Sequence, residues 1–345
     1  MAGPLPLGVL LPFAVSWLLT AGLIRWAPRL GLVDKPDPRK SHAVPTPSGG
    51  GLAIYAGLLA TWLVAVVGRG QLGVGGLPFP ILALGLGLVL LGLIDDLRPL
   101  PWQLRLGVQF AVAGVAVVGW MPTDSWPLRA AGLVWVVGLV NAFNMLDNMD
   151  ALSGGTAAVA AGALAVLRWW SLPAEDGAAL PCVAFVAAVA GFLWFNRPPA
   201  RIFMGDAGST FLGFALGLVS LDLTLRAGQE PGAAPGAWAA PLAVLAVPYY
   251  DLATVVLLRL RQGRSPFHAD RQHLSHRLVA LGLSRPAAVG TICLMALASG
   301  TAGLLLYRVP DAVGAALVGL LLACCWAAVA GVEYVRRLLS PPPSA

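Results

Sequence analysis

The chain has 345 residues, of which 58% are hydrophobic and only 11% are charged, and its mean hydropathy is +0.79. A soluble domain carries about a quarter charged residues, so this composition excludes an ordinary globular protein. Apolar runs of roughly 17 to 25 residues recur along the chain without the alternation typical of strands, which favours membrane-spanning helices over a membrane β-barrel.

These runs predict an all-α, polytopic integral membrane protein with about 10 to 11 transmembrane helices in a single domain over residues 1–345. The first run has no evident cleavage site, so we expect it to be a retained helix and not a secretory signal. The predicted helix centres are Ser16, Leu59, Gly87, Ala113, Val134, Ala160, Ala187, Ala215, Leu245, Ala296 and Leu321.

Basic residues predict the orientation of these helices, because cytoplasmic loops are enriched in Lys and Arg. Most of the 22 basic residues fall on the connections that share a side with the C-terminus. The other side carries only Arg69, Arg129, Arg168, Arg226 and Arg308. We therefore expect the N-terminus outside and the C-terminus in the cytoplasm. All four histidines and most aspartates also fall on the cytoplasmic side, so polar chemistry is expected there.

The first polar segments in chain order are LVDKPDPRKSHAVPTPSGGG and GLIDDLRPL. In the first, Lys40 and His42 could reach an anion, or they only mark topology. In the second, Asp95 and Asp96 end the third apolar run. Adjacent helical residues point about 100° apart, so one carboxylate is expected to face a site while the other holds a neighbour. The alternative is a solvated helix end.

The next polar segment is NAFNMLDNMDALSGG, between two apolar runs. Asn141, Asn144, Asp147 and Asp150 are spaced by three, which on a helix gives one polar stripe. Such a stripe can face a polar ligand or a hydrated metal ion. The alternative is hydrogen bonding between two helices, which is common in membrane proteins.

Two further segments follow, FNRPPARIFMGDAGSTFLG and RLRQGRSPFHADRQHLSHRL. Asp206 precedes a new helix, where it can bind Mg²⁺ or simply cap that helix. In the second segment, Arg271, His273 and His276 suit a diphosphate, because arginine and protonated histidine donate strong hydrogen bonds to it. The alternative for this loop is binding of lipid headgroups. Carboxylates for Mg²⁺ beside basic groups for phosphate are the equipment of phosphoryl transfer.

Taken in order, these five segments resemble the motifs of the polyprenyl-phosphate N-acetylhexosamine-1-phosphate transferases, which are related to phospho-MurNAc-pentapeptide transferase. The resemblance implies transfer of a sugar-1-phosphate, GlcNAc-1-phosphate fitting best, from a UDP-N-acetylhexosamine to undecaprenyl phosphate, with release of UMP. This is the first membrane step of a cell-envelope glycan pathway such as lipopolysaccharide or teichoic acid synthesis. It also implies Mg²⁺, with Mn²⁺ as a substitute, and a multi-pass cytoplasmic-membrane enzyme with its site on the cytoplasmic face. A homodimer is open, and no nucleic-acid partner is expected.

The resemblance also assigns roles. Asp206 matches the metal ligand, and Asp95 matches the carboxylate proposed as base or nucleophile, supported by Asp96. The remaining matched residues would bind the donor: Asn144, Asp147 and Asp150 at the nucleotide, Phe203 on the uracil, and Arg271, His273 and His276 at the diphosphate and acetamido sugar.

Three positions depart from the family pattern. Asn148 and Ala151 stand where the usual DGxDG has glycine, and Ser275 stands for a histidine of the usual HLHHRL. Two functions of other classes are open from the sequence. An intramembrane aspartyl protease would use Tyr250-Asp251 and Gly205-Asp206, but the order of the two pairs is reversed. A transporter would place ionisable residues near the bilayer midplane. Phospho-MurNAc-pentapeptide transferase activity is the alternative within the transferases.

Overall fold

The computed structural model describes residues 4–34, 44–69, 78–171, 179–229, 232–267 and 270–339. The helices that it describes are α1 (Pro4–Trp26), α2 (Gly50–Arg69), α3 (Pro78–Leu97), α4 (Trp102–Trp120), α5 (Trp126–Leu146), α6 (Leu152–Ser171), α7 (Leu180–Asn196), α8 (Asp206–Ala227), α9 (Ala240–Val244), α10 (Ala246–Arg261), α11 (Leu274–Ala280), α12 (Arg285–Arg308) and α13 (Ala312–Leu339). Two short 3₁₀ turns, Ala27–Leu30 and Ala237–Ala239, and a two-residue antiparallel pair, β1 (Val33–Asp34) with β2 (Thr46–Pro47), complete them.

The expected all-α membrane architecture is confirmed. In the described part of the chain, eight helices are long and apolar enough to cross a bilayer, and a ninth span results if α9 and α10 count as one. The 20-residue α3 and the 17-residue α7 are two further apolar helices. Of the eleven predicted centres, only Leu245 lies outside a helix, between α9 and α10.

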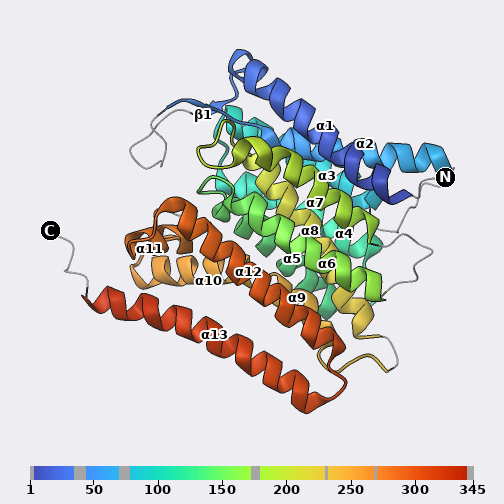
Figure 1. Cartoon of the computed structure of the whole chain (residues 1–345), viewed down its shortest axis with the longest axis vertical. Coiled ribbons are helices and arrows are strands. Elements are labelled where there is room, and N and C mark those ends of the chain that lie inside the picture. Colours follow the sequence, from blue (N-terminus) through green and yellow to red (C-terminus); the bar gives the residue numbers. More distant parts are fainter. Residues whose placement is uncertain are drawn as a thin grey trace.

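The span predicted around Leu245 is not one continuous helix, because the chain bends there by 65°. Pro248 explains the bend. Proline has no backbone N–H, so the carbonyl of Val244 loses the hydrogen bond that a continuous helix would give it. The bend turns α10 and the loop that follows it toward the polar end of the bundle (Figure 1).

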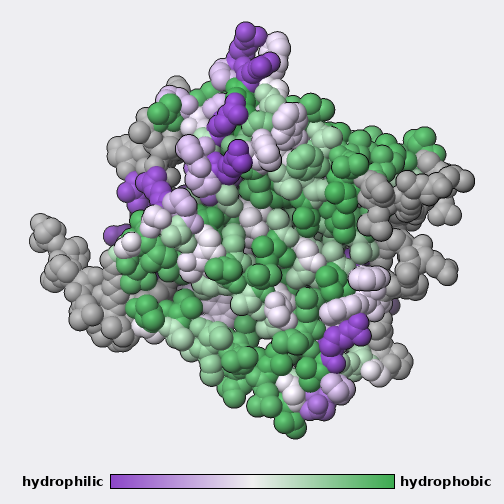
Figure 2. All heavy atoms as spheres, in the orientation of Figure 1, coloured by the Kyte–Doolittle hydropathy of each residue, from purple (hydrophilic) through white to green (hydrophobic). Residues whose placement is uncertain are grey.

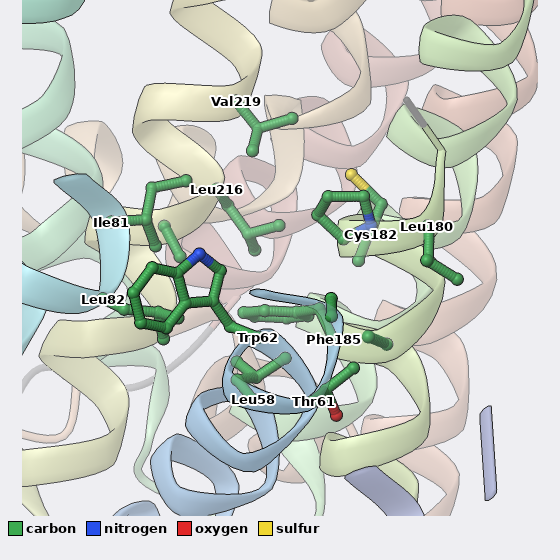
Figure 3. Close-up of a pocket in the computed structure, with 15 residues that line it drawn as sticks. Leu58, Thr61, Trp62, Ile81, Leu82, Leu180, Cys182, Phe185, Leu216 and Val219 are labelled. Atoms are coloured by element: carbon green, nitrogen blue, oxygen red, sulfur yellow. The ribbon is translucent and has the colours of Figure 1, made fainter. Parts of the chain in front are cut away.

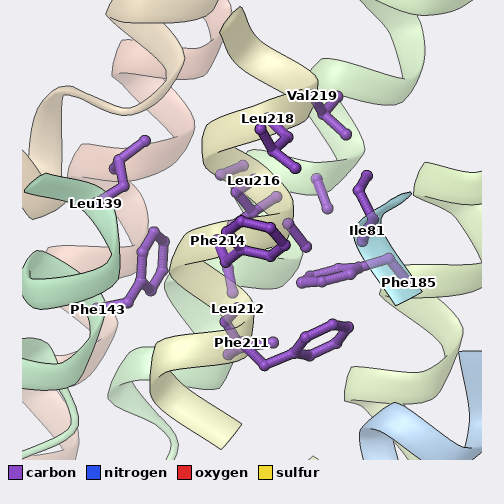
Figure 4. Close-up of a cluster of buried hydrophobic side chains, with 14 of the residues drawn as sticks. Ile81, Leu139, Phe143, Phe185, Phe211, Leu212, Phe214, Leu216, Leu218 and Val219 are labelled. Carbon is purple, nitrogen blue, oxygen red and sulfur yellow. The ribbon is translucent and has the colours of Figure 1, made fainter. Parts of the chain in front are cut away.

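Helix α8 is the centre of the bundle and is buried on almost every side. It packs against α5, α3, α2 and α6. Phe211 and Phe214 of α8 are fully buried, and Leu139 and Phe143 of α5 lie beside them (Figure 4). A central helix with no lipid-facing side can hold its first residue, Asp206, in a fixed position.

The periphery is apolar. Leu317, Leu320 and Leu321 of α13 are more than half exposed, and α13 packs mainly against α12 at the edge of the bundle (Figure 1). Hydrophobic residues cover most of the visible surface in Figure 2. Exposed leucines on a long apolar helix are the surface that lipid chains cover.

Polar residues gather at one end of the bundle, where α3, α5 and α7 end and α2 and α8 begin. The opposite half holds an apolar cavity of about 90 Å³ between α2, α3, α7 and α8. Trp62, Ile81, Phe185 and Leu216 line it (Figure 3). No charged side chain lines this cavity, whereas acidic and basic side chains gather at the polar end.

Candidate active site

A pocket of about 360 Å³ opens at the polar end of the bundle, a size suited to a small ligand. Eight of the residues singled out from the sequence line it: Asp96, Asp147, Asp150, Phe203, Asp206, Arg271, His273 and His276. The structure therefore brings together segments that are up to 180 residues apart along the chain. Asp95 and Asn144 do not line the pocket themselves. Lys40 and His42 fall outside the described residues.

Asp206 begins α8 and its side chain is 31% exposed to the pocket. One carboxylate oxygen accepts a 2.9 Å hydrogen bond from the amide of Asn144, and the other accepts a 3.0 Å bond from Arg105. Arg105 also bonds Asp95 at 2.5 Å. One guanidinium thus balances two carboxylates and fixes their separation.

Asp95 and Asp96 do different work. Both Asp95 oxygens are occupied, one by the N–H of Leu100 at 2.6 Å and one by Arg105. Asp96 accepts the N–H of Asp206 at 3.0 Å, where an anion complements the start of a helix. Its second oxygen, Oδ2, is buried without a hydrogen-bond partner among the described residues. An unpartnered buried carboxylate oxygen is costly, which indicates that this oxygen serves a ligand.

Gly205 makes the contact between these segments possible. Its φ is +75°, a conformation that favours glycine, and a Cβ atom here would collide with the carboxylate of Asp96. A side chain at position 205 would therefore push Asp206 away from Asp96. The glycine before Asp206 is needed both for the turn and for the approach.

The continuous helical stripe predicted from Asn141 to Asp150 is wrong beyond Leu146, where α5 ends. Asp147 is the C-cap of α5 and Asp150 lies in the following turn. Asn141 bonds Gln109 of α4 at 2.7 Å, so this residue joins two helices instead of facing the pocket. Asn144 is the member of the stripe that reaches Asp206.

Asp147 is held largely in its neutral form at neutral pH. Burial, together with the negative charges of Asp206, Asp96 and Asp150, raises the pKa of Asp147 to about 8. A cation bound among these carboxylates would reverse that effect. The carboxylates of Asp96, Asp147, Asp150 and Asp206, which we call the acidic wall, therefore need a cation to offset their mutual repulsion.

The turn after Asp147 is tied to the end of α7. Ala151 has φ +63°, and its N–H donates a 2.9 Å bond to Asn196. The carboxylate of Asp150 accepts the N–H of Ala200 at 2.9 Å. Ala151 thus retains the left-handed conformation for which glycine is suited, although the family's glycine is absent.

The opposite wall is the loop between α10 and α11. His273 is the N-cap of α11, and its Nδ1 lies 2.8 Å from Oδ2 of Asp251, with both side chains buried. The other Asp251 oxygen accepts the N–H of Leu274. The same loop is tied by Arg259, which bonds Asp270 at 2.9 Å. Two buried acid–base pairs therefore hold this loop in one shape.

His276 lies beside His273, with 6.3 Å between the ring centroids. Burial, together with the positive charges of His273 and Arg271, lowers the pKa of His276 to about 4. The prediction of a protonated histidine at this position is therefore wrong at neutral pH. His276 acts as a neutral hydrogen-bonding group, and Arg271 is the permanent cation of this wall.

Asp270 behaves differently from His276. Burial alone would raise its pKa, but hydrogen bonds from Arg259 and from the N–H of Gln272, with the Arg259 charge, hold the pKa of Asp270 below its usual range. Arg277 donates hydrogen bonds to the carbonyl of Gln272 and to the hydroxyl of Thr254.

The two walls meet through Asn148 and Ser275. The hydroxyl of Ser275 donates a 2.5 Å hydrogen bond to the amide oxygen of Asn148, across 127 positions of sequence. Phe203 closes a third side. Its N–H bonds the carbonyl of Pro47 and its carbonyl accepts the N–H of Gly50, so β2 and the start of α2 hold it against the pocket.

The carboxylates of the pocket fit Mg²⁺ if a bound phosphate supplies further ligands. No group of three or more His, Cys, Asp or Glu residues in the described segments is arranged to hold a metal ion by itself. The free Oδ2 of Asp96 and the exposed carboxylate of Asp206 offer two hard oxygen ligands. Mg²⁺ commonly takes one or two carboxylates and completes its shell with water and substrate phosphate oxygens, so the site suits this ion only together with a phosphate ligand.

Sequence reasoning missed four residues of this site: Arg105, Asn196, Asp251 and Ser48. In the sequence, Arg105 is one of the basic residues that indicate orientation, but an arginine in the first turn of a helix and ten residues after Asp95 is also a signal for an ion pair. Asp251 was noted only for its place after Tyr250. Its oxygens bond His273 and Leu274 while those of Asp206 bond Asn144 and Arg105, so the two aspartates do not form a protease pair.

Comparison with known proteins then decides the family. Residues 78–224 match the family described as Glycosyl transferase family 4. The undecaprenyl-phosphate alpha-N-acetylglucosaminyl 1-phosphate transferase of Escherichia coli K12 is 30% identical over 302 residues, which cover 81% of this chain and 77% of that protein.

The chain belongs to the polyprenyl-phosphate N-acetylhexosamine-1-phosphate transferase family, within glycosyl transferase family 4.

Two further relatives agree with this assignment. The decaprenyl-phosphate N-acetylglucosaminephosphotransferase of Mycolicibacterium smegmatis is 33% identical over 309 residues, covering 80% of this chain and 74% of that protein. A probable undecaprenyl-phosphate N-acetylglucosaminyl 1-phosphate transferase of Bacillus subtilis is 29% identical over 313 residues, covering 83% and 82%. The matched region of the family includes α3, α5 and the start of α8, which carry the acidic wall.

Proposed function

We propose that this protein transfers N-acetylglucosamine-1-phosphate from UDP-N-acetylglucosamine to undecaprenyl phosphate and releases UMP. The observation that carries the proposal is a single pocket whose acidic wall, with Asp96 and Asp206, faces a wall with Arg271, His273 and His276. Carboxylates that can hold a cation, opposite donors that suit phosphate oxygens, are what a diphosphate donor requires. The names of the three relatives support the sugar and the polyprenyl acceptor.

The walls of the pocket would contact different parts of the UDP-sugar donor. Asp147 and Asp150 would face the nucleotide, and Phe203 would lie against the uracil. Arg271, as the permanent cation, would contact the diphosphate, and the neutral His276 would hydrogen-bond the acetamido sugar. Bound Mg²⁺, held by Asp206 and Asp96, would neutralise charge on the phosphate oxygens.

The reaction is best described as a direct displacement. An oxygen of the acceptor phosphate forms a bond to the phosphorus that carries the sugar, and the bond from that phosphorus to UMP breaks. UMP leaves with the electron pair, so no proton transfer is required of a strong base, since the acceptor phosphate is largely ionised near pH 7. Asp95 does not line the pocket and both of its oxygens are hydrogen-bonded, which together argue against Asp95 as a covalent nucleophile.

The pocket is proposed to face the cytoplasm, where the donor would be available. The excess of Lys and Arg on this side of the bundle supports that orientation. The end of α10, the loop after it and α11 carry Arg259, Arg261, Arg264, Arg271 and Arg277 on the same side as the pocket. A homodimer stays a prediction.

The test uses the purified full-length protein in detergent with undecaprenyl phosphate and Mg²⁺. A panel of UDP-sugars is supplied singly, and UMP release is measured with formation of a lipid-linked sugar. We expect UMP and lipid product from UDP-N-acetylglucosamine in equal amounts, and loss of both when EDTA is added. Absence of UMP with every UDP-sugar would refute the proposal.

A further inference from the structure

A second groove lies on the outer side of the same end of the bundle, between α1 and the loop that follows α7. Its volume is about 370 Å³. The apolar part is lined by Leu18, Ala21, Gly22 and Phe195, and its rim carries Arg25 and Arg201. We call it the α1 groove. None of its lining residues belongs to the active-site pocket, and no carboxylate lines it.

The shape of the groove matches a lipid. From Trp26 at the rim to Leu18 is eight residues of helix, or about 12 Å along α1. At Gly22, midway, an added Cβ would meet no atom within 4 Å. The middle of the groove is therefore open space along an apolar helix face, where one acyl chain can lie.

The rim of the groove carries positive charge. The guanidinium of Arg201 lies 5.5 Å over the ring of Phe195, and that of Arg29 lies 4.8 Å over the ring of Trp26. Among the residues that the structure describes, no carboxylate pairs with Arg25 or Arg201. Figure 2 shows hydrophilic residues gathered over this end of α1, above an apolar surface.

The end of α7 separates the groove from the active site. Phe195 lines the groove, whereas the next residue, Asn196, turns to the pocket and bonds the N–H of Ala151. A phosphate at the rim thus lies on the far side of α7 from Asp96 and Asp206. It cannot be the phosphate that reacts.

We propose that the α1 groove binds an anionic phospholipid of the bilayer, with its phosphate between Arg25 and Arg201 and one acyl chain over Gly22. Positive-inside placement explains arginines at a helix end, but it does not explain an open apolar channel beneath two of them. Charge complementarity selects an anionic over a zwitterionic headgroup, because each arginine near a surface of this kind contributes about 1 kcal/mol to binding. The occupant would brace α1 against α7 behind the turn that holds Asp150.

The test is binding, measured by native mass spectrometry of the full-length protein in detergent with phosphatidylglycerol or phosphatidylcholine. We expect wild-type protein to retain phosphatidylglycerol in preference to phosphatidylcholine. Arg25→Gln and Arg201→Gln should each weaken phosphatidylglycerol binding about fivefold, and the double variant about thirtyfold. Arg264→Gln, which removes an exposed arginine away from the groove, is the matched control and should bind like wild type.

A second variant tests the channel without changing charge. Gly22→Leu fills open space and improves helix propensity, so the protein should fold, yet it should lose the same preference. Equal retention of both lipids by wild type, or no effect of Gly22→Leu, would overturn the proposal. So would displacement of phosphatidylglycerol by stoichiometric undecaprenyl phosphate, because the groove would then belong to the acceptor. These readouts do not require transferase activity, so the proposed function can fail independently.

Discussion

Ser275 and Asn148 are joined by a 2.5 Å hydrogen bond, although both depart from the residues usual in the family. Ser275 is fully buried, while Asn148 lines the active-site pocket and also donates to the carbonyl of Met145. The bond ties the loop that carries His273 and His276 to the turn that carries Asp147. Two substitutions that look unrelated in sequence are therefore one contact between the walls of the site.

The pair predicts coupled effects on donor binding. Ser275→Ala leaves the Asn148 oxygen without its partner, and a lost buried hydrogen bond costs about 1–3 kcal/mol. We expect the KM for the UDP-sugar to rise about tenfold in Ser275→Ala and in Asn148→Gly. The double variant should be no worse than either single one, because both remove the same contact. Additive losses in a steady-state double-mutant cycle would contradict the pairing.

Asp251 is predicted to position His273 without touching substrate. In Asp251→Asn, one oxygen becomes an amide that cannot accept a hydrogen bond, so either His273 or the N–H of Leu274 loses its partner. We expect kcat/KM to fall about tenfold to a hundredfold, mainly through KM for the donor, as for other orienting partners of histidine.

The control for this prediction is Asp311→Asn, which changes an exposed aspartate whose side chain accepts the N–H of Gly314. It should keep wild-type kinetics. A fall in the amount of folded Asp251→Asn protein with unchanged KM in the remainder would show that Asp251 serves stability alone.

His276 predicts a pH dependence of stability. Its pKa in the folded protein is about 4, whereas an unfolded histidine titrates near 6.5. Between these values the unfolded chain binds a proton that the folded chain does not, so stability is full above about pH 6.5 and is lost as the pH falls toward 4. The loss is about 2 kcal/mol, below the full pKa difference because the ring is partly exposed.

Thermal unfolding in detergent between pH 4 and 8 measures this effect. The Tm of wild type should fall more steeply below pH 6.5 than that of His276→Gln, which cannot take up the proton. Parallel pH curves for the two proteins would show that His276 does not titrate in this window.

Ala151 is predicted to carry backbone strain. A non-glycine residue at φ +63° costs about 1 kcal/mol relative to glycine, and Ala151→Gly relieves this cost without removing a side-chain hydrogen bond. We expect Ala151→Gly to raise the Tm by a few degrees and to leave the donor KM unchanged. The control is Ala207→Gly, which places glycine within the buried first turn of α8 and should lower the Tm. A lower Tm for Ala151→Gly as well would contradict the strain at position 151.

The sequence predicts most of the helices of this protein. For the site, it predicts the acidic and the basic residues as two separate groups but not how they meet. Long apolar runs place ten of the eleven helix centres, because hydropathy over a bilayer thickness is a local property. The bend at Leu245 is caused by one proline, Pro248, within an apolar run. A prediction from hydropathy alone does not detect such a bend. The acidic and the basic wall are each visible as motifs.

What the sequence does not give is the contacts between distant segments. Arg105, which also bonds Asp95, reaches Asp206 across 101 positions, and Ser275 reaches Asn148 across 127. Such contacts depend on how α3, α4, α5 and α8 pack, which no local pattern encodes. The neutral state of His276 has the same origin, because its pKa is set by burial and by charges brought near in the fold.

If the acidic wall around Asp206 is where sugar phosphate is transferred, Asp206→Asn should lose this reaction. The measurement is formation of lipid-linked N-acetylglucosamine from labelled UDP-N-acetylglucosamine by Asp206→Asn, beside Asp124→Asn, which alters a fully exposed aspartate paired with Arg129. We expect wild-type product from Asp124→Asn and a loss of at least about a thousandfold for folded Asp206→Asn, as when a stabilising group at a phosphoryl-transfer site is removed. Product from Asp206→Asn at a tenth of the wild-type rate or more would contradict it.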